Sequence, residues 1–253
     1  MTQLPGIAGK LVVVTGASRG IGLGIARAFA EAGAQLHLIA DDAAIEPVAQ
    51  ELGGQGYVAD ITNVEEIEHA MAAVARVDVL INNAGLERLT PLDEVSSEVE
   101  RVFRRVVEVN VVGTYLTTRA AVPRMPGGGA IINTASVWSR SSEPGFSAYV
   151  ASKHATLGLT KTWAQELGPK RIRVNAVCPG WVRTAASLLS LTRMAERSGR
   201  TEDAVLAEVL RGQILEGLME PDDVTGPYLF LASDLAANIT GQSLGIDRGE
   251  LPW

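Results

Sequence analysis

A tyrosine and a lysine stand four residues apart at Tyr149 and Lys153, within a segment, 136–153, that also holds six serines. On a helix, residues at this spacing share one face, so the phenol and the ammonium would lie close together. A free tyrosine has a pKa of about 10 and is a poor base at neutral pH. A neighbouring positive charge lowers that pKa, which suits general acid–base catalysis. The pair therefore indicates a proton-transfer site, and the spacing alone leaves open which serine belongs to it.

A glycine-rich turn lies near the start of the chain. The sequence TGASRGIG, residues 15–22, follows the apolar run LVVVT and precedes a helical pattern that ends at Gly33. Gly16, Gly20 and Gly22 let the backbone turn tightly and approach a ligand where a Cβ atom would collide. The start of the next helix offers free N–H groups and a positive dipole end to a pyrophosphate. The turn therefore indicates a dinucleotide-binding site.

Short apolar runs alternate with helical patterns along nearly the whole chain. Strands are expected at 11–15, 35–40, 56–59, 78–82, 130–136, 172–178 and 243–247. Long helices are expected over much of 96–122, beginning at Ser96 or Ser97, and at 149–167. This alternation predicts the α/β class: a single-domain, Rossmann-type, doubly wound parallel sheet with helices on both faces. Two short helical patterns in 185–216 depart from it and predict a small helical lid insertion.

The composition argues against several classes of protein. Of 253 residues, 47% are hydrophobic, which is enough for one domain with a large core, and the net charge of −7 argues against nucleic-acid binding. The one cysteine, Cys178, cannot form an intrachain disulfide, and no apolar run approaches the ~20 residues that span a bilayer. The three histidines lack the paired spacing of a metal site. We therefore expect a cytoplasmic protein without a bound metal and without a membrane partner.

The motifs together resemble those of the classical short-chain dehydrogenase/reductase (SDR) family. TGASRGIG matches the T-G-x-x-x-G-x-G turn of that family, and NNAG at 82–85 follows the fourth expected strand. YVASK at 149–153 matches Y-x-x-x-K, and PGWVRT at 179–184 follows the sixth strand. The resemblance covers nearly the entire chain. It implies an oxidoreductase that transfers a hydride between a nicotinamide cofactor and an alcohol or ketone.

The resemblance also implies a catalytic tetrad. Tyr149 would be the general acid/base, and Ser136, thirteen residues before it, would bind the substrate oxygen. Asn110 would hold a water that links Lys153 to solvent as a proton relay. An asparagine inside a helix is locally unfavourable, which makes a purely structural role for Asn110 less attractive.

Cofactor-binding residues follow from the same resemblance: Gly16, Ser18, Arg19, Gly20, Ile21, Gly22, Asp41, Asp60, Ile61, Asn82, Ala84, Gly85, Tyr149, Lys153, Pro179, Gly180, Val182 and Thr184. Of these, Asp60 and Ile61 would flank the adenine, and Thr184 would contact the carboxamide. Asp41 and Asp42, at the end of the second strand, would repel the 2′-phosphate of NADP, and Asp41 would reach the ribose. Asp42 itself is interpreted as a solvated loop residue. Arg19 favours a phosphate, but the two acids outweigh it, so NAD is favoured.

The sequence leaves the identity of the substrate open. The residues expected to line its pocket are Glu87, Arg88, Trp138, Arg140, Phe146 and Trp181. The tryptophans suggest a partly apolar substrate, whereas the charged side chains suggest recognition of hydroxyls or of an anionic group. A sugar or polyol, a cyclic or aryl alcohol, and a hydroxy acid all fit these residues.

Two other functions compete with an NAD-dependent alcohol dehydrogenase. One is an NADPH-dependent carbonyl reductase, such as a 3-oxoacyl reductase. The other is a cofactor-sensing binding or regulatory protein, against which the intact set of four catalytic residues argues. The resemblance further implies a homotetramer, with a homodimer as the alternative, and we expect Trp253 to be buried against a neighbouring subunit.

Overall fold

The expected strands form one parallel sheet in the computed structural model, which describes residues 4–252. Trp253 lies outside the described residues. The strands are β1 (Leu11–Thr15), β2 (Gln35–Ala40), β3 (Gln55–Val58), β4 (Val79–Asn82), β5 (Gly129–Thr134), β6 (Ile172–Pro179) and β7 (Ser243–Ile246). Their order is β3-β2-β1-β4-β5-β6-β7, and every neighbouring pair is parallel. The predicted fold class is therefore confirmed.

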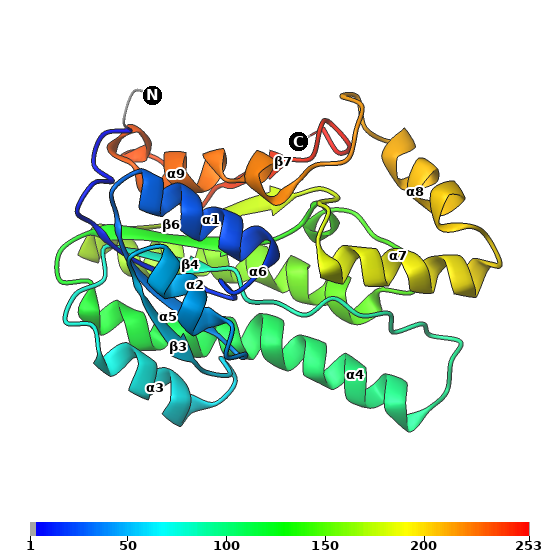
Figure 1. Ribbon diagram of the computed structural model, residues 1–253, viewed down its shortest axis with the longest axis horizontal. Helices are drawn as coiled ribbons and strands as arrows, with labels where there is room; N and C mark the ends of the chain where they lie inside the picture. The colour runs from blue at the N-terminus through cyan, green and yellow to red at the C-terminus, as the bar shows by residue number, and fades with distance from the viewer. Residues whose placement is uncertain (1–3, 253) are drawn as a thin grey trace.

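Helices cover both faces of this sheet. They are α1 (Gly20–Glu31), α2 (Ile45–Glu51), α3 (Val64–Ala72), α4 (Ser97–Val107), α5 (Thr114–Ala121), α6 (Ser147–Leu167), α7 (Ala185–Ser198), α8 (Glu202–Arg211) and α9 (Gly226–Ala232). Buried residues of α1, α2 and α9 form one core cluster with the sheet, and those of α3, α5 and α6 form another. Figure 1 shows α1 and α9 on one side of the strands and α3 and α5 on the other.

The alternation of side chains along β1 explains why its sequence is apolar throughout. Val12 and Val14 belong to the cluster under α1, whereas Val13 belongs to the cluster under α6, and all three are fully buried. A strand covered on both faces has no solvent side, so an uninterrupted apolar run is the pattern that it requires. The sheet thereby acts as a rigid platform whose strand ends position the loops.

The strand order reverses between β1 and β4. The chain runs from β1 to β2 and β3 on one side, and then returns to continue with β4 to β7 on the other. The connections after β1 and β4 therefore leave the sheet in opposite directions and open a crevice at its carboxyl edge. Ligands of doubly wound folds bind at such a switch point.

The long helix expected over 96–122 is interrupted. Ser96 caps it, since its hydroxyl accepts a hydrogen bond from the Val99 N–H at 3.2 Å. Between α4 and α5 lies a π-helical turn, Glu108–Gly113, with Asn110 near its middle. A π turn inserts an extra residue into the helix and is frequent at functional sites.

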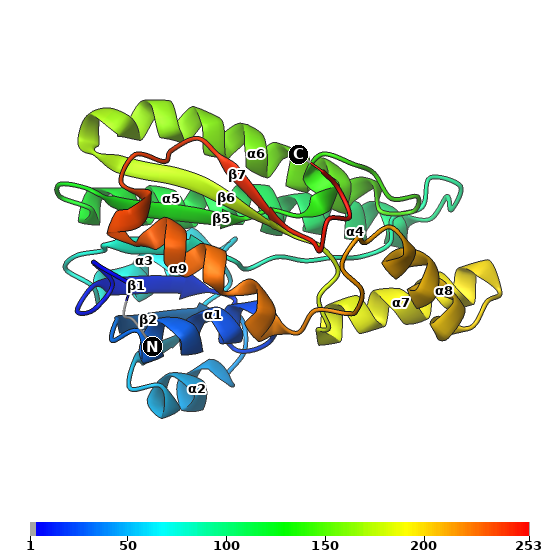
Figure 2. The same cartoon turned by 90° about the horizontal axis from the view of Figure 1, so that it is seen from above.

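Two helices, α7 and α8, fill the segment in which a lid was predicted. Figure 2 shows both beyond the carboxyl ends of the strands, away from the body of the sheet. Within residues 4–252, no helix is long and apolar enough to cross a bilayer.

Burial of His37 in β2 predicts that the stability of the fold depends on pH. Its side chain is 1% exposed and stacks on Tyr57, with ring centroids 4.4 Å apart. Burial lowers the pKa of His37 from 6.5 to about 4, and the Ala70 backbone opposes this shift in part. Below pH 6.5 the unfolded chain binds a proton that the folded chain does not, so stability is lost as the pH falls from 6.5 toward 4. Because of His37, we expect the free energy of unfolding to be about 1–2 kcal/mol smaller at pH 5 than at pH 7.5.

Urea denaturation at the two pH values measures this effect. His37→Phe should reduce the pH-dependent loss, because the substituted ring cannot take up a proton. His69→Gln, a change at an exposed histidine of α3, is the matched control and should leave the loss intact. Equal losses in wild type and His37→Phe would contradict the prediction.

Candidate active site

The glycine turn packs too tightly for side chains at two of its positions. Gly16 adopts φ +65°, a left-handed conformation that favours glycine, and a Cβ there would lie 2.8 Å from Ala84 Cα. A Cβ on Gly22 would lie 2.0 Å from the Gly16 carbonyl oxygen. Arg19 precedes α1 in extended conformation without a side-chain cap, so the first N–H groups of the helix have no side-chain partner there. A turn of this kind fits the pyrophosphate of a dinucleotide.

Asp42 fastens this turn to the end of β2. Its Oδ2 atom accepts hydrogen bonds from Ser18 Oγ at 2.7 Å and from Arg19 Nη1 at 2.5 Å, and Oδ1 accepts one from Ala44 N. Partial burial raises the pKa of Asp42, but these hydrogen bonds and the Arg19 charge outweigh it and hold that pKa below its usual range. Asp42 is thus a partly exposed loop residue whose carboxylate is held in place by these hydrogen bonds rather than free in solvent. Asp41 is the exposed acid of the pair, with Oδ1 4.0 Å from Arg19 Nη2.

Asp60 and Ile61 lie further along the same cleft. Asp60 pairs with Arg105 of α4, 2.5 Å from Oδ2 to Nη2, and also accepts a hydrogen bond from Thr62 N. Ile61 is buried against Gly113, where a Cβ would lie 2.6 Å from Ile61 Cγ1. Arg105 thus orients the carboxylate that was expected beside the adenine.

The NNAG segment is arranged differently from the expectation. The amide of Asn82 points into the protein, where it donates to Thr118 Oγ1 at 2.9 Å and to Asn133 Oδ1 at 2.8 Å. Asn83 lines the cleft instead, and its Nδ2 donates to the carbonyl oxygens of Thr15 and Gly16. The Asn82 amide therefore supports the sheet, and the asparagine side chain at the cleft is the next one along the chain.

Lys153 and Tyr149 lie together on α6. Lys153 Nζ is 5.5 Å from the centre of the Tyr149 ring and donates to the Thr134 carbonyl oxygen at 2.7 Å. Burial lowers the pKa of Lys153 to about 8, while Glu87 acts to raise it. Burial also raises the pKa of Tyr149, and the charge of Glu87 adds to that rise, whereas the Ser136 hydroxyl lowers it.

Ser136 and Asn110 are each fixed by local hydrogen bonds. The Ser136 hydroxyl accepts from Trp138 N at 3.2 Å, and Ser139 Oγ accepts from Ser136 N at 3.0 Å, so a reciprocal cap holds the turn after β5. The Asn110 side chain exchanges two hydrogen bonds with the Leu86 backbone, Leu86 N to Oδ1 at 2.7 Å and Nδ2 to Leu86 O at 3.0 Å. The turns thus present both polar side chains at the carboxyl edge of the sheet.

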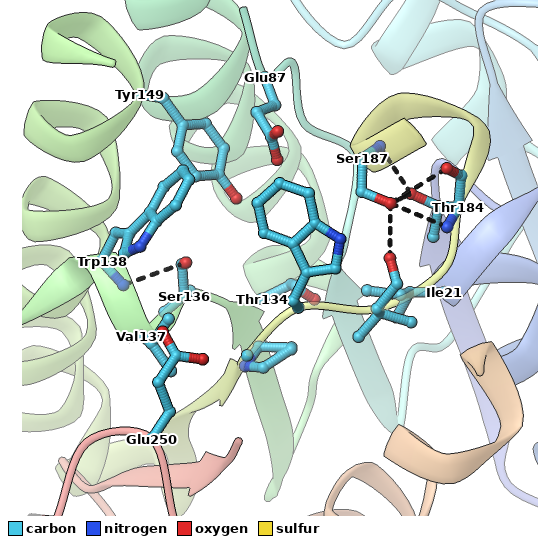
Figure 3. A pocket seen from close by; sticks show the side chains of 15 residues that line it. Ile21, Glu87, Thr134, Ser136, Val137, Trp138, Tyr149, Thr184, Ser187 and Glu250 are labelled. Atoms are coloured by element: carbon cyan, nitrogen blue, oxygen red, sulfur yellow. Dashed lines mark hydrogen bonds between the residues drawn. The ribbon is translucent and has the colours of Figure 1, made fainter. Parts of the chain in front are cut away.

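A cleft of about 630 Å³ and an inner cavity of about 90 Å³ meet at this edge. The cleft is lined by most of the residues expected to bind the cofactor: Gly16, Ser18, Arg19, Gly20, Ile21, Gly22, Asp41, Asp60, Ile61, Ala84, Gly85, Tyr149, Lys153 and Thr184. Pro179, Gly180 and Val182 line the inner cavity. Ile21, Glu87, Thr134, Tyr149 and Thr184 line both spaces. The phenol of Tyr149 therefore stands where the two spaces join (Figure 3).

The six residues expected at the substrate separate into two groups. Glu87, Trp138 and Trp181 line the inner cavity. The other three do not line it. Arg88 lies in the cleft and donates to the Glu87 carbonyl oxygen, whereas Phe146 is fully buried behind Trp138. Arg140 donates to Ser243 Oγ of β7 at 2.6 Å. Arg140 and Phe146 therefore line neither space.

The residues of the inner cavity that were missed include Ser187 and Glu250. Ser187 belongs to the start of α7, where its hydroxyl and that of Thr184 cap the helix reciprocally. Glu250 reaches the cavity from the far end of the chain, and burial raises its pKa to about 7, with Asp247 and Glu143 adding to the rise. Within residues 4–252, no group of three His, Cys, Asp or Glu side chains is placed to hold a metal ion.

Comparison with known proteins agrees with this geometry. A family model described as enoyl-(acyl carrier protein) reductase matches residues 16–250. The D-beta-hydroxybutyrate dehydrogenase of Rhizobium meliloti is 38% identical over 95% of this chain and 98% of its own length. The 3-oxoacyl-[acyl-carrier-protein] reductase FabG of Thermotoga maritima is 35% identical over 95% and 97%. The ligand-free structure of Thermoplasma acidophilum aldohexose dehydrogenase superposes with a TM-score of 0.85 at 30% identity, covering 98% of this chain and 96% of that one.

A Rossmann-type sheet whose glycine turn opens onto a half-buried tyrosine beside a buried lysine defines a nucleotide-dependent oxidoreductase. The chain belongs to the short-chain dehydrogenase/reductase family. It is an enzyme that transfers a hydride between a nicotinamide dinucleotide and an alcohol or ketone.

The packing at Gly22 yields a test of the cofactor cleft. Gly22→Ala places a methyl group 2.0 Å from the Gly16 carbonyl oxygen, so the turn must move. We expect NADH affinity, followed by fluorescence titration, to fall at least about tenfold. Gly226→Ala, at a helix position where a Cβ meets nothing within 4 Å, is the matched control and should bind NADH as wild type does. Unchanged affinity of Gly22→Ala would remove this turn from the binding site.

Proposed function

We propose that the chain is an NAD-dependent dehydrogenase of a secondary alcohol, with Tyr149 as the general acid/base. The observation that carries the proposal is the position of the Tyr149 phenol, at the junction of the nucleotide cleft and the inner cavity, beside buried Lys153. When bound, the nicotinamide supplies the hydride acceptor or donor. The chain's own residues bind the substrate oxygen and move its proton.

Each member of the tetrad has a place in this chemistry. Ser136, held by its turn, would hydrogen-bond the substrate oxygen and orient it toward the phenol. Tyr149 would take the alcohol proton during oxidation and return it during reduction. The ammonium of Lys153 would stabilise the tyrosinate, offsetting the burial that raises the pKa of the phenol. Asn110, whose side chain also holds the backbone of Leu86, would hold a water that links Lys153 to solvent as a proton relay.

Tyr149→Phe should reduce turnover by at least about three orders of magnitude and leave NAD binding nearly unchanged, because only the acid–base hydroxyl is lost. In wild type, kcat/KM for oxidation should rise with pH, since the phenol must lose its proton to act as a base. Both are measured by NADH absorbance over a panel of secondary alcohols. Activity of Tyr149→Phe close to that of wild type, or a flat pH profile, would contradict this assignment.

The preference for NAD over NADP is supported by the charges around the adenosine end of the cleft. Asp41 and Asp42 place two carboxylates there, and Arg19, the basic residue that favours NADP, is paired with Asp42. A 2′-phosphate would meet the acids and would have to compete with Asp42 for Arg19. The alternative function, an NADPH-dependent carbonyl reductase, is favoured only by Arg19. The Arg19–Asp42 ion pair is therefore the feature to test.

We expect wild type to use NAD at least about tenfold better than NADP, in kcat/KM. Asp42→Asn removes the ion pair and should raise kcat/KM for NADP by about tenfold, while NAD kinetics of the same variant report any damage to the turn. A wild type that prefers NADP, or an Asp42→Asn variant with an unchanged NADP/NAD ratio, would contradict this part of the proposal.

The proposal extends to the lid, to assembly and to location. Ser187 of α7 lines the inner cavity, and Met194, Val205 and Val209 of α7 and α8 line an outer groove, which supports a covering role for these helices.

Exposed apolar side chains on the α4–α5 segment, Phe103, Val112 and Tyr115, support a homotetramer or homodimer, whose mass light scattering would measure. The cytoplasm stays the proposed location.

A further inference from the structure

Tyr228 of α9 is a buried tyrosine that reaches the end of β5 from the face of the sheet opposite to α6. Its side chain is fully buried in the core cluster that α1 and α9 form with the sheet. Its hydroxyl lies 2.9 Å from Oγ1 of Thr134, the last residue of β5. Burial raises the pKa of Tyr228, and the hydrogen bond to Thr134 offsets that rise only in part. The phenol is therefore neutral near neutral pH and acts through its hydrogen bond rather than through charge.

Thr134 is held from both faces of the sheet. Its hydroxyl is bonded to Tyr228 of α9, and its carbonyl oxygen accepts a hydrogen bond from Lys153 Nζ of α6 at 2.7 Å. One residue at a strand end therefore links a helix on each face. Because the buried ammonium depends on this carbonyl oxygen, any shift of Thr134 also shifts the position that Lys153 prefers.

The backbone alone supports Thr134 on one side only. It pairs with Val177 of β6, whereas the ladder between β4 and β5 ends one residue earlier, at Asn82 and Asn133. The hydrogen bond of its side chain to Tyr228 therefore supplies support at a point where the sheet itself is ending.

The directions of the surrounding hydrogen bonds make the phenol the donor in this link. The amide nitrogen of Asn83 donates to the carbonyl oxygens of Thr15 and Gly16, so its Oδ1 atom faces Thr134 as an acceptor, 3.4 Å from Oγ1. A threonine hydroxyl has one proton, which is directed to that acceptor. Tyr228 then donates to Thr134, and its hydroxyl completes a network that extends to the glycine turn.

We propose that Tyr228 is a positioning residue: through Thr134 it fixes the carbonyl oxygen that binds the Lys153 ammonium, and so keeps the ammonium beside the Tyr149 phenol. This inference rests on the proposed dehydrogenase function and adds to it a residue that lines neither the cleft nor the inner cavity. An ammonium held close to a phenol favours its ionised form, so Tyr228 acts on the acid–base step.

The groups around the pair determine the sign of the expected effect. Burial raises the pKa of Tyr149, Glu87 adds to that rise, and Tyr228 adds a smaller rise. Burial lowers the pKa of Lys153, and Glu87 and Cys178 oppose this. Both of these groups stay in place when Tyr228 is changed. Loss of the Tyr228 phenol by itself would lower the pKa of Tyr149, whereas an ammonium held less closely would raise it. An upward shift therefore identifies the positioning role.

Tyr228→Phe removes the hydroxyl and keeps the buried ring. We expect the acid limb of the pH profile of kcat/KM for oxidation to move upward by about 0.5–1 pH unit, the effect of losing one buried hydrogen bond. At neutral pH this is a loss of about three- to tenfold, and the loss should shrink at alkaline pH. NADH absorbance with a secondary alcohol that wild type oxidises measures the profile.

A double-mutant cycle tests whether the effect passes through Thr134. Thr134→Val keeps the carbonyl oxygen and removes the hydroxyl, so it should shift the acid limb in the same direction. The double variant Tyr228→Phe/Thr134→Val should shift it no further than the larger single change, because both substitutions break one link.

Ser233→Ala is the matched control from the other end of α9. It removes a fully buried hydroxyl, which donates to the Phe230 carbonyl oxygen and accepts from Leu235 N. This variant should lose thermal stability without a change in the pH profile. Thermal denaturation and NADH titration verify that each variant is folded, and Thr134→Val carries the test where Tyr228→Phe does not fold.

The outcomes separate this inference from the function beneath it. An unchanged or downward-shifted acid limb in Tyr228→Phe would overturn the positioning role and leave the dehydrogenase in place. Additive shifts in the double variant, or an equal shift in Ser233→Ala, would also overturn it, because the effect would then come from the packing of α9. If wild type oxidises no secondary alcohol while it binds NADH, the proposed function fails, and the inference fails with it.

Discussion

Burial of the Lys153 amino group is the constraint on which the rest of the site depends. The side chain is 5% exposed, and its Nζ atom donates to the Thr134 carbonyl oxygen at the end of β5. Because taking a charge out of water is costly, the surrounding structure must supply partners for it. Thr134 is held in the sheet by its pairing with Val177, and its hydroxyl is hydrogen-bonded to Tyr228 at 2.9 Å. The acceptor for the ammonium is therefore as rigid as the centre of the sheet.

The π-helical turn places Asn110 where its side chain connects segments of the site. Through its side chain, Asn110 joins the backbone of Leu86 to the hydroxyl of Ser152, which also donates to the Tyr149 carbonyl oxygen. Three segments that are distant in sequence, the loop after β4, the α4–α5 junction and the start of α6, are locked together by one buried amide. Glu87 follows Leu86 directly, so the same amide fixes the acid of the inner cavity relative to Tyr149.

Most of the fold followed from the sequence because each strand is an apolar run bounded by helical patterns. Side-chain direction at strand ends was harder, as Asn82 and Asn83 illustrate. They are adjacent, yet the first, at the end of β4, donates inward to Asn133, and the second, in the loop that follows, lines the cleft. The sequence motif names both asparagines and does not distinguish their directions.

Other features of the site could not be predicted because they depend on contacts between segments that are distant in the sequence. Arg140 follows Trp138 closely, but only the approach of β7 determines that its guanidinium reaches Ser243 rather than the cavity. Glu250 lies about a hundred residues from Trp138, and no local pattern connects them. Ser187 was missed because it stands at the start of a helical pattern, where its visible role is the cap with Thr184 and nothing local indicates that it also faces the cavity.

That capping contact joins the cofactor segment to the two helices beyond the sheet. Thr184 lines both cleft and cavity, and its reciprocal hydrogen bonds with Ser187 fix where α7 begins. The outer end of α7 is tied to the rest of the protein by the exposed Asp93–Arg197 ion pair, and exposed pairs contribute about 0–1 kcal/mol. The ion pair is therefore a minor tie, and burial of Leu191, Ala195 and Val205 in one apolar cluster with Trp138 and Trp181 holds the two helices on the site. Because moving these helices would expose that apolar surface to water, their position over the inner cavity depends on the same cluster that packs behind Tyr149.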